Sequence, residues 1–171
     1  MPVGVLEAPS GPRVLKSGDY EGQTLEVLMF NEYGHLVFVK KMMDKNLVNG
    51  SSSSEFHKHL EWLLGQGENR VVSGVCLGCH TRPVTRFSVL GSEQDGYSMS
   101  ALYTCCDDRA CEEMIALLAI GKTPIFLPVR FSSLMYFKYK HDRLQVVSLL
   151  KGLFNLPQRI NRDIAFQFFS Q

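Results

Sequence analysis

The five cysteines of this 171-residue chain constrain its fold more than any other feature, because all of them lie between residues 76 and 111. Cys76 and Cys79 form a Cys-x-x-Cys pair, and Cys105, Cys106 and Cys111 form a second cluster further along the chain. Two short thiol clusters can place four sulfurs around one tetrahedral ion, and Zn²⁺ accepts four thiolates at about 2.3 Å. The sequence therefore predicts a structural Zn²⁺ site whose ligands are Cys76, Cys79, Cys106 and Cys111.

Other interpretations of these thiols compete with zinc. An odd number of cysteines cannot pair completely, and the first residues carry no export signal, so a disulfide framework is the weaker explanation. The run from Cys76 to His80 matches the attachment signature of a c-type haem, but haem would leave three cysteines without a purpose. A thioredoxin-like pair would begin a helix, whereas extended residues follow here. Buried cysteines without metal are the main alternative, and within a zinc site Cys105 or His80 could replace one ligand.

A site closed by four thiolates would stabilise the fold and would not catalyse a reaction. Such an ion has no open position for substrate, and it contributes about 10 kcal/mol or more of folding free energy in small modules. Four carboxylates near the second cluster are expected to cap a helix rather than to do chemistry, namely Asp107, Asp108, Glu112 and Glu113. We therefore expect a protein that is not an enzyme, with an enzyme that uses these carboxylates, or the histidines discussed below, as the alternative.

The near balance of charges excludes a strong overall electrostatic field, since 18 basic and 17 acidic side chains leave a formal net charge of +1. Binding to DNA or RNA would need a local patch. Basic residues flank both cysteine clusters and continue into a later run that alternates with aromatic residues, which could contact phosphates and stack on bases. The predicted nucleic-acid contacts are Arg82, Arg86, Arg109, Lys138 and Lys140. The competing interpretation is a solvated face whose aromatic residues turn into the core.

No window of the sequence approaches the ~20 apolar residues that cross a bilayer. We therefore expect no membrane partner and a cytoplasmic location. The sequence leaves the oligomeric state open.

Hydrophobic periodicity predicts an α+β fold in which helical segments flank a central zinc-binding β-hairpin module. We expect a flexible lead over residues 1–13, a helical segment over 14–70, the hairpin with one helix over 71–121, and a mostly helical segment over 122–171. The length allows one compact unit or two small lobes, and we expect one compact unit.

Capping residues and glycines predict where the helices begin and end. The third helix, over about Glu55 to Gly65, is expected to stop at its glycines. The predicted helix starts are Thr24, Asn31, Ser54, Asp107 or Asp108, Asp142 and Pro157. The predicted apolar faces include Met114, Ile115, Leu117, Leu118 and Ile120 in the helix after the cysteines, and Leu144, Val147, Leu150 and Leu153 in the following one.

Two histidines of the third helix, His57 and His59, suggest a second metal site at first sight. Positions two apart on a helix point to different faces, so the two rings cannot easily chelate one ion together. The sequence favours a polar helix face for both.

The order of a Cys-x-x-Cys knuckle, a hairpin, and cysteines at a helix start resembles the treble-clef zinc fingers over residues 71–120. In that family the last two ligands flank the first turn of a helix. The second cysteine pair departs from the usual two-residue spacing, and the hairpin is longer than the usual ~15 to 20 intervening residues. The resemblance implies a structural Zn²⁺ and a treble-clef fold for this module.

The run Gly18-Asp19-Tyr20-Glu21-Gly22-Gln23-Thr24-Leu25 is similar to the Gly-x-Tyr-x-Gly-x-Thr-Leu motif of a small module at the C-terminus of exodeoxyribonuclease X. The likeness covers about residues 14–64. It implies a nucleic-acid role, although Asp19 and Glu21 stand where lysines are common in that family and would repel phosphate. The alternative is a structural turn that packs Tyr20 under the next helix.

Taken together, these features predict a non-enzymatic, zinc-stabilised binding module for nucleic acid or for a protein that handles it. A zinc-dependent or nuclease-associated enzyme is one alternative. A protein-interaction adaptor of phage or mobile-element type is another, with the apolar helix over Ile160 to Phe169 as its interface.

Overall fold

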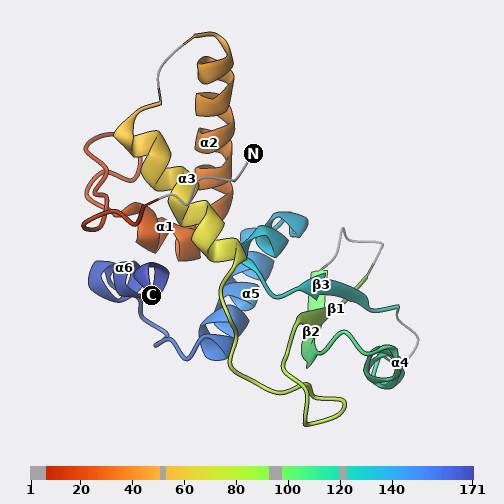
Figure 1. Cartoon of the computed structure of the whole chain (residues 1–171). Coiled ribbons are helices and arrows are strands. Elements are labelled where there is room, and N and C mark those ends of the chain that lie inside the picture. The colour runs from red at the N-terminus through yellow and green to blue at the C-terminus, as the bar shows by residue number, and fades with distance from the viewer. Residues whose placement is uncertain (1–6, 51–52, 93–97, 120–122) are drawn as a thin grey trace. The chain divides into compact units, whose positions relative to one another are not determined.

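The computed structural model describes residues 7–50, 53–92, 98–119 and 123–171. They form two compact units (Figure 1). The helical unit comprises Met1–Asn69 and Arg159–Gln171, and the sheet unit comprises Arg70–Gln158. Residues 1–6 of the predicted flexible lead lie outside the described residues.

The helical unit is built from α1 (Leu25–Asn31), α2 (Tyr33–Val48), α3 (Glu55–Glu68) and α6 (Arg162–Ser170). Helix α1 contacts each of the other three. Its Phe30 ring lies 5.7 Å from the ring of Phe169 between centroids, and both side chains are buried. The last helix of the chain therefore completes a core that begins with the first.

Two of the predicted caps in this unit are confirmed. The Thr24 hydroxyl accepts a hydrogen bond from the Val27 amide, and the Ser54 hydroxyl accepts one from the His57 amide. These bonds satisfy amide groups that the first turn of a helix leaves unpaired.

Other boundaries in the helical unit differ from the prediction. Asn31 ends α1, and the capping position of α2 is Glu32, which makes no side-chain capping bond. Helix α3 continues past Gly65 to Glu68, because a glycine inside a helix costs only about 1 kcal/mol. The last helix begins after Asn161, whose side chain accepts the Asp163 and Ile164 amides, and not at Pro157.

The sheet unit contains a three-stranded antiparallel sheet in the order β2-β1-β3, formed by β1 (Arg86–Ser92), β2 (Ser98–Cys105) and β3 (Ile125–Pro128). The remaining elements are α4 (Arg109–Leu117), the 3-10 helix η2 (Phe131–Tyr136) and α5 (Lys140–Leu153). Mixed helices and a small antiparallel sheet make this an α+β protein. The predicted hairpin is the pair β1 and β2, and residues 93–97 between these strands lie outside the described residues.

One predicted helix face in the sheet unit is largely wrong, and another is largely confirmed. In α4 only Ile115 of the predicted apolar face is buried, whereas Met114, Leu117 and Leu118 are exposed, and Ile120 lies outside the described residues. A short helix at the side of a small sheet can bury only a narrow stripe of its surface.

In α5 three residues of the predicted face are buried, namely Val147, Leu150 and Leu153, whereas Leu144 is exposed and Val146 is buried in addition. Asp142 lies inside the first turn of α5 and does not cap it, because Tyr139 holds the capping position. None of the described helices is long and apolar enough to span a bilayer.

Candidate metal centre

Three short segments of the sheet unit bring four cysteine sulfurs together. Cys76 and Cys79 precede β1, Cys106 directly follows β2, and Cys111 lies in the first turn of α4. The four Sγ atoms all lie within 4.8 Å of one another, and all the side chains except that of Cys79 are buried. The structure thus juxtaposes the four cysteines that the sequence singles out as ligands.

The register of the hairpin explains how the two cysteine clusters meet, although Cys79 and Cys106 are 27 positions apart in the sequence. Antiparallel pairing sets the end of β2 opposite the start of β1, with Arg86 opposite Cys105. The Leu77 amide donates to the Thr104 carbonyl over 3.1 Å, so the Cys-x-x-Cys segment itself attaches to the end of β2. The strand pairing therefore brings both cysteine clusters to the same end of the hairpin.

The Cys-x-x-Cys segment forms a tight turn whose amides point at sulfur. The Gly78 amide donates to Cys76 Sγ over 3.2 Å, and the Arg82 amide donates to Cys79 Sγ over 3.4 Å. The turn is closed by a hydrogen bond of 2.8 Å from the His80 amide to the Cys76 carbonyl. Amide donors of this kind stabilise the thiolate form that a metal ion requires.

Gly78 is required because of a close contact with α4 and not because of a positive φ. A Cβ atom at this position would lie 3.0 Å from the Cys111 Cβ and 3.2 Å from its Cα. The left-handed backbone conformation belongs instead to His80, whose φ is 54°. Gly78 therefore lets the Cys-x-x-Cys turn approach α4 closely enough for the sulfurs to gather.

The pKa values of the thiols differ across the cluster. Hydrogen bonds from the Thr81 side chain and from the Arg82 and Thr81 amides lower the pKa of Cys79 to about 6. Burial tends to raise the pKa of Cys76, but amide hydrogen bonds, from Cys79 first, outweigh it and the pKa falls. Burial, together with hydrogen bonds to neighbouring cysteines, raises the pKa of Cys111. A bound cation would favour the thiolate form of Cys111, which burial disfavours.

The donor set fits a tetrahedral metal ion. Sulfurs bound at about 2.3 Å to one zinc lie roughly 3.8 Å apart, so the observed cluster needs only a small contraction. Four soft sulfur donors and largely buried side chains are the features of a closed structural site. Four cysteines near one another could thus coordinate a metal ion, with no ligand position left for a substrate.

The two predicted substitute ligands lie outside this group of four. Cys105 is fully buried, and burial raises the pKa of its thiol to about 12, with further contributions from the charge of Cys76 and a side-chain hydrogen bond to it. Burial of Cys105 therefore disfavours the thiolate form that a metal ligand needs. His80 is exposed.

The three arginines predicted to contact nucleic acid each form an ion pair with a carboxylate at or in α4. Arg82 pairs with Asp108, Arg86 with Glu112 and Arg109 with Glu113. The first two pairs connect the Cys-x-x-Cys segment and β1 to α4. Asp108 also caps α4 through the Ala110 amide, as predicted. The charges of the three arginines are therefore largely balanced by carboxylates of the same unit.

The later basic run is different, because two of its tyrosines face solvent. The exposed fractions of Tyr136 and Tyr139 are 41% and 44%, whereas Phe137 between them is buried. The Lys138 ammonium lies 5.6 Å from the centre of the Tyr139 ring. The prediction that aromatic residues of this run turn into the core holds only for Phe137.

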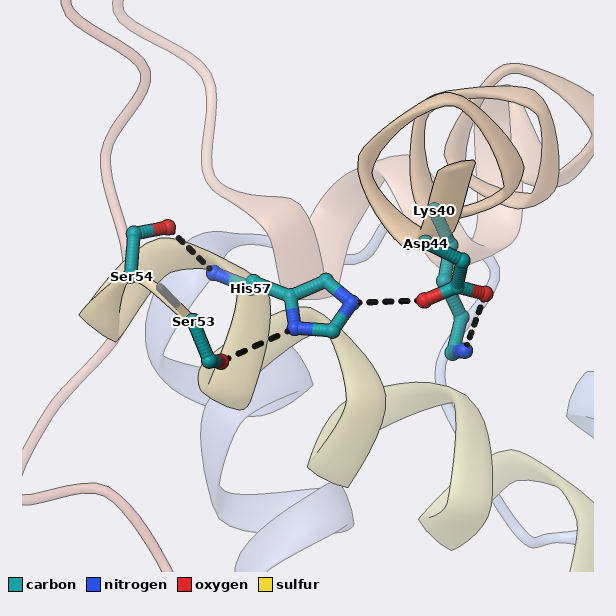
Figure 2. Close-up of polar contacts among 5 residues, drawn as sticks. All are labelled: Lys40, Asp44, Ser53, Ser54 and His57. Atoms are coloured by element: carbon teal, nitrogen blue, oxygen red, sulfur yellow. Dashed lines mark hydrogen bonds and ion pairs between the residues drawn. The ribbon is translucent and has the colours of Figure 1, made fainter. Parts of the chain in front are cut away.

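The histidines of α3 do not form a polar face, and that prediction is wrong. His57 and His59 are both buried, and each meets a carboxylate from another helix. His57 Nε2 lies 2.7 Å from Asp44 Oδ1 on α2, and its Nδ1 lies 3.0 Å from the Ser53 hydroxyl (Figure 2). His59 Nε2 lies 2.5 Å from Oε1 of the fully buried Glu26 on α1. The two rings point to different faces, as the spacing predicts.

Comparison with known proteins adds no relative, since no family model, no curated protein and no solved structure matches this chain. The similarity of residues 14–64 to the exodeoxyribonuclease X module stays a prediction. The treble-clef assignment likewise depends on the arrangement of the cysteines alone.

Proposed function

We propose that the sheet unit is a non-enzymatic binding module of treble-clef type, stabilised by Zn²⁺ at Cys76, Cys79, Cys106 and Cys111. The observation that carries this proposal is the approach of four sulfurs to within 4.8 Å of one another. A four-thiolate ion supplies folding free energy and rigidity and offers no open coordination position. The carboxylates nearest to Cys111 support the same conclusion, because they are occupied in ion pairs with arginines.

The segment from Tyr136 to Arg143 forms the surface of this module that suits a ligand best, and the ligand that fits it is single-stranded nucleic acid. Exposed tyrosines can stack on bases, and Lys138 and Lys140 can contact phosphates on either side of Tyr139. The arginines near the cysteines contribute less, since a phosphate must compete with their carboxylate partners.

The test measures the fluorescence anisotropy of a labelled oligothymidine and of a labelled oligouridine at low and moderate salt. Binding should weaken steeply with salt, because each phosphate contact releases about 0.7 of a counterion from a single strand. Lys138→Ala with Lys140→Ala should reduce affinity at least tenfold, and Tyr139→Ala should reduce it by a similar factor, since stacking is worth about 1 to 3 kcal/mol per base.

Lys58→Ala with Lys45→Ala is the matched control, because it removes the same charge from exposed positions of the helical unit. An unchanged anisotropy at low salt would exclude nucleic acid as the ligand. Equal losses in both double variants would mean a general charge effect and no site at this segment.

A protein partner is the second candidate, favoured by the exposed apolar side chains of α4. Met114, Leu117 and Leu118 all face solvent. The helix that the sequence suggests as an adaptor interface does not offer this surface, because Phe168 and Phe169 of α6 are buried in the helical unit. Self-association that Leu117→Ser abolishes would support α4 as an interface, and a monomer at all concentrations would exclude a second copy of this chain as the partner.

A further inference from the structure

A cavity of about 570 Å³ lies in the helical unit. It is open to solvent on one side and is lined by the segment from Arg13 to Tyr20 together with residues of α1, α2 and α3. Its volume falls within the range of roughly 300 to 1,000 Å³ that small-molecule sites occupy.

The inner wall of this cavity is apolar. Leu25 of α1 and Leu36 of α2 are buried and line it, together with Val39 and the half-buried ring of Phe56. Such a surface gains free energy when it covers an apolar body, and the flat ring of Phe56 suits an aromatic one.

The rim of the cavity carries more positive than negative charge. Arg13 and Lys16 line it with one carboxylate, that of Asp19. The imidazole ring of His35 also lines the cavity, and its centroid lies 4.8 Å from the centroid of the Tyr20 ring. Cationic side chains at the mouth of an apolar cavity favour a ligand with a negative head and an apolar body.

Backbone hydrogen bonds connect the segment that forms this rim to the residues at the start of α1. The Leu15 amide donates to the Gln23 carbonyl over 2.8 Å, and the Leu25 amide donates to the Arg13 carbonyl over 3.0 Å. Between these bonds Gly18 adopts a φ of +90°, which a residue with a side chain rarely takes. The rim is therefore a fixed loop.

The buried Glu26 and His59 pair supports the same segment. Glu26 Oε2 accepts the Arg13 amide over 3.3 Å, while its Oε1 lies 2.5 Å from His59 Nε2. The carboxylate thus joins the start of the rim to α3. This connection gives the pair a role in shaping the cavity.

From the apolar wall, the cationic rim and the fixed loop, we infer that the helical unit binds a small aromatic anion in this cavity. The aromatic body lies against Leu36, Val39 and Phe56, and the negative head lies at Arg13 and Lys16. The shared chemistry covers an aryl carboxylate and an aryl phosphate. This site is separate from the zinc module and does not depend on its proposed function.

The test titrates the full-length, ¹⁵N-labelled protein with four probes and follows amide chemical shifts. The probes are 1-naphthoate, 1-naphthyl phosphate, the neutral 1-naphthalenemethanol and inorganic phosphate. We expect one or both aromatic anions to bind at least tenfold more tightly than the neutral alcohol or phosphate, with shifts at Leu15, Gly18 and Val39. Whichever aromatic anion binds more tightly identifies the head group.

Arg13→Ala with Lys16→Ala should weaken the aromatic anions about tenfold or more and leave the neutral alcohol unchanged. Val39→Trp, which fills the cavity, should abolish binding of all aromatic probes. Lys41→Ala with Lys45→Ala on α2 removes equal charge outside the cavity and should have no effect. The inference is overturned if no aromatic anion shifts these amides, if the neutral alcohol binds as tightly, or if the rim variant binds normally.

Discussion

The two units of this chain bury polar groups by opposite means. The helical unit buries His57 and His59 and pairs each with a carboxylate from another helix. The sheet unit gathers cysteines, and its buried cluster around the candidate metal centre consists of Cys76, Cys105, Cys106, Cys111 and Ile115. The buried histidines of the helical unit have partners from its own side chains, whereas the clustered cysteines of the sheet unit could be held together by a metal ion.

This difference has a consequence for stability. The helical unit has large apolar side chains such as Phe30, Leu63 and Phe169 at its centre, so burial of apolar surface can stabilise it without metal. Among the residues that the structure describes, the buried cluster around the four sulfurs contains one side chain that is not a cysteine, that of Ile115. The folding of the sheet unit near α4 should therefore follow metal occupancy, and that of the helical unit should not.

Removal of metal is expected to have the largest effect. Excess chelator, or Cys76→Ser, should unfold the region from Val75 to Leu117, because a structural zinc contributes about 10 kcal/mol or more to small modules. Hydrogen exchange of the full-length protein should then rise throughout this region, while α1, α3 and α6 keep their protection. Simultaneous loss of protection in both units would contradict the comparison.

A smaller but substantial effect is expected from Glu26→Ala in the helical unit. The variant leaves His59 and the Arg13 amide without their acceptor inside the protein, which should cost about 3 kcal/mol. Chemical denaturation monitored at Trp62, whose ring lies beside His59, measures the loss. Glu26→Gln, which keeps an acceptor oxygen, should lose less, and equal losses for the two variants would argue against the pairing.

Gly78→Ala should weaken metal binding without unfolding the helical unit. The added methyl would lie 3.0 Å from Cys111 Cβ and push the Cys-x-x-Cys turn away from α4, so we expect about a tenfold loss of metal affinity. Competition with a chromogenic chelator measures it. The control is Gly65→Ala at an exposed position of α3, where no atom lies within 4 Å of the added methyl. This variant should leave metal affinity unchanged.

The smallest expected effect on stability is the pH dependence of the hydrogen bond between Asp44 of α2 and His57 of α3. Hydrogen bonds from Lys40 and then from His57 lower the pKa of Asp44, so its contribution to stability is present above the ordinary aspartate pKa and is lost as the pH falls through the lowered value. Since this carboxylate is half exposed, Asp44→Asn should cost roughly 0.5 kcal/mol near neutral pH and nothing near about pH 2. A pH-independent difference would contradict this account.

The sequence predicts local features of both units well. The spacing of the cysteines anticipates which four sulfurs meet, because a Cys-x-x-Cys turn and a hairpin each have a fixed geometry. Thr24, Ser54 and Asp108 cap their helices as expected, because a cap involves residues only two or three positions apart.

The contacts that the sequence does not predict join distant residues. Glu26 meets His59 from 33 positions away, and nothing around Glu26 distinguishes it from an exposed acid of a first helical turn. The exposure of Met114 and Leu117 likewise depends on how little of α4 the small sheet can cover. Such features are decided by tertiary packing and not by local pattern.

The most direct test of the account is the metal content and ligand type of the purified protein. Elemental analysis with X-ray absorption at the zinc edge should find one zinc per chain with four sulfur neighbours at about 2.3 Å. Protein that is fully folded without metal, with its five cysteines reacting freely with a thiol reagent, would contradict the account.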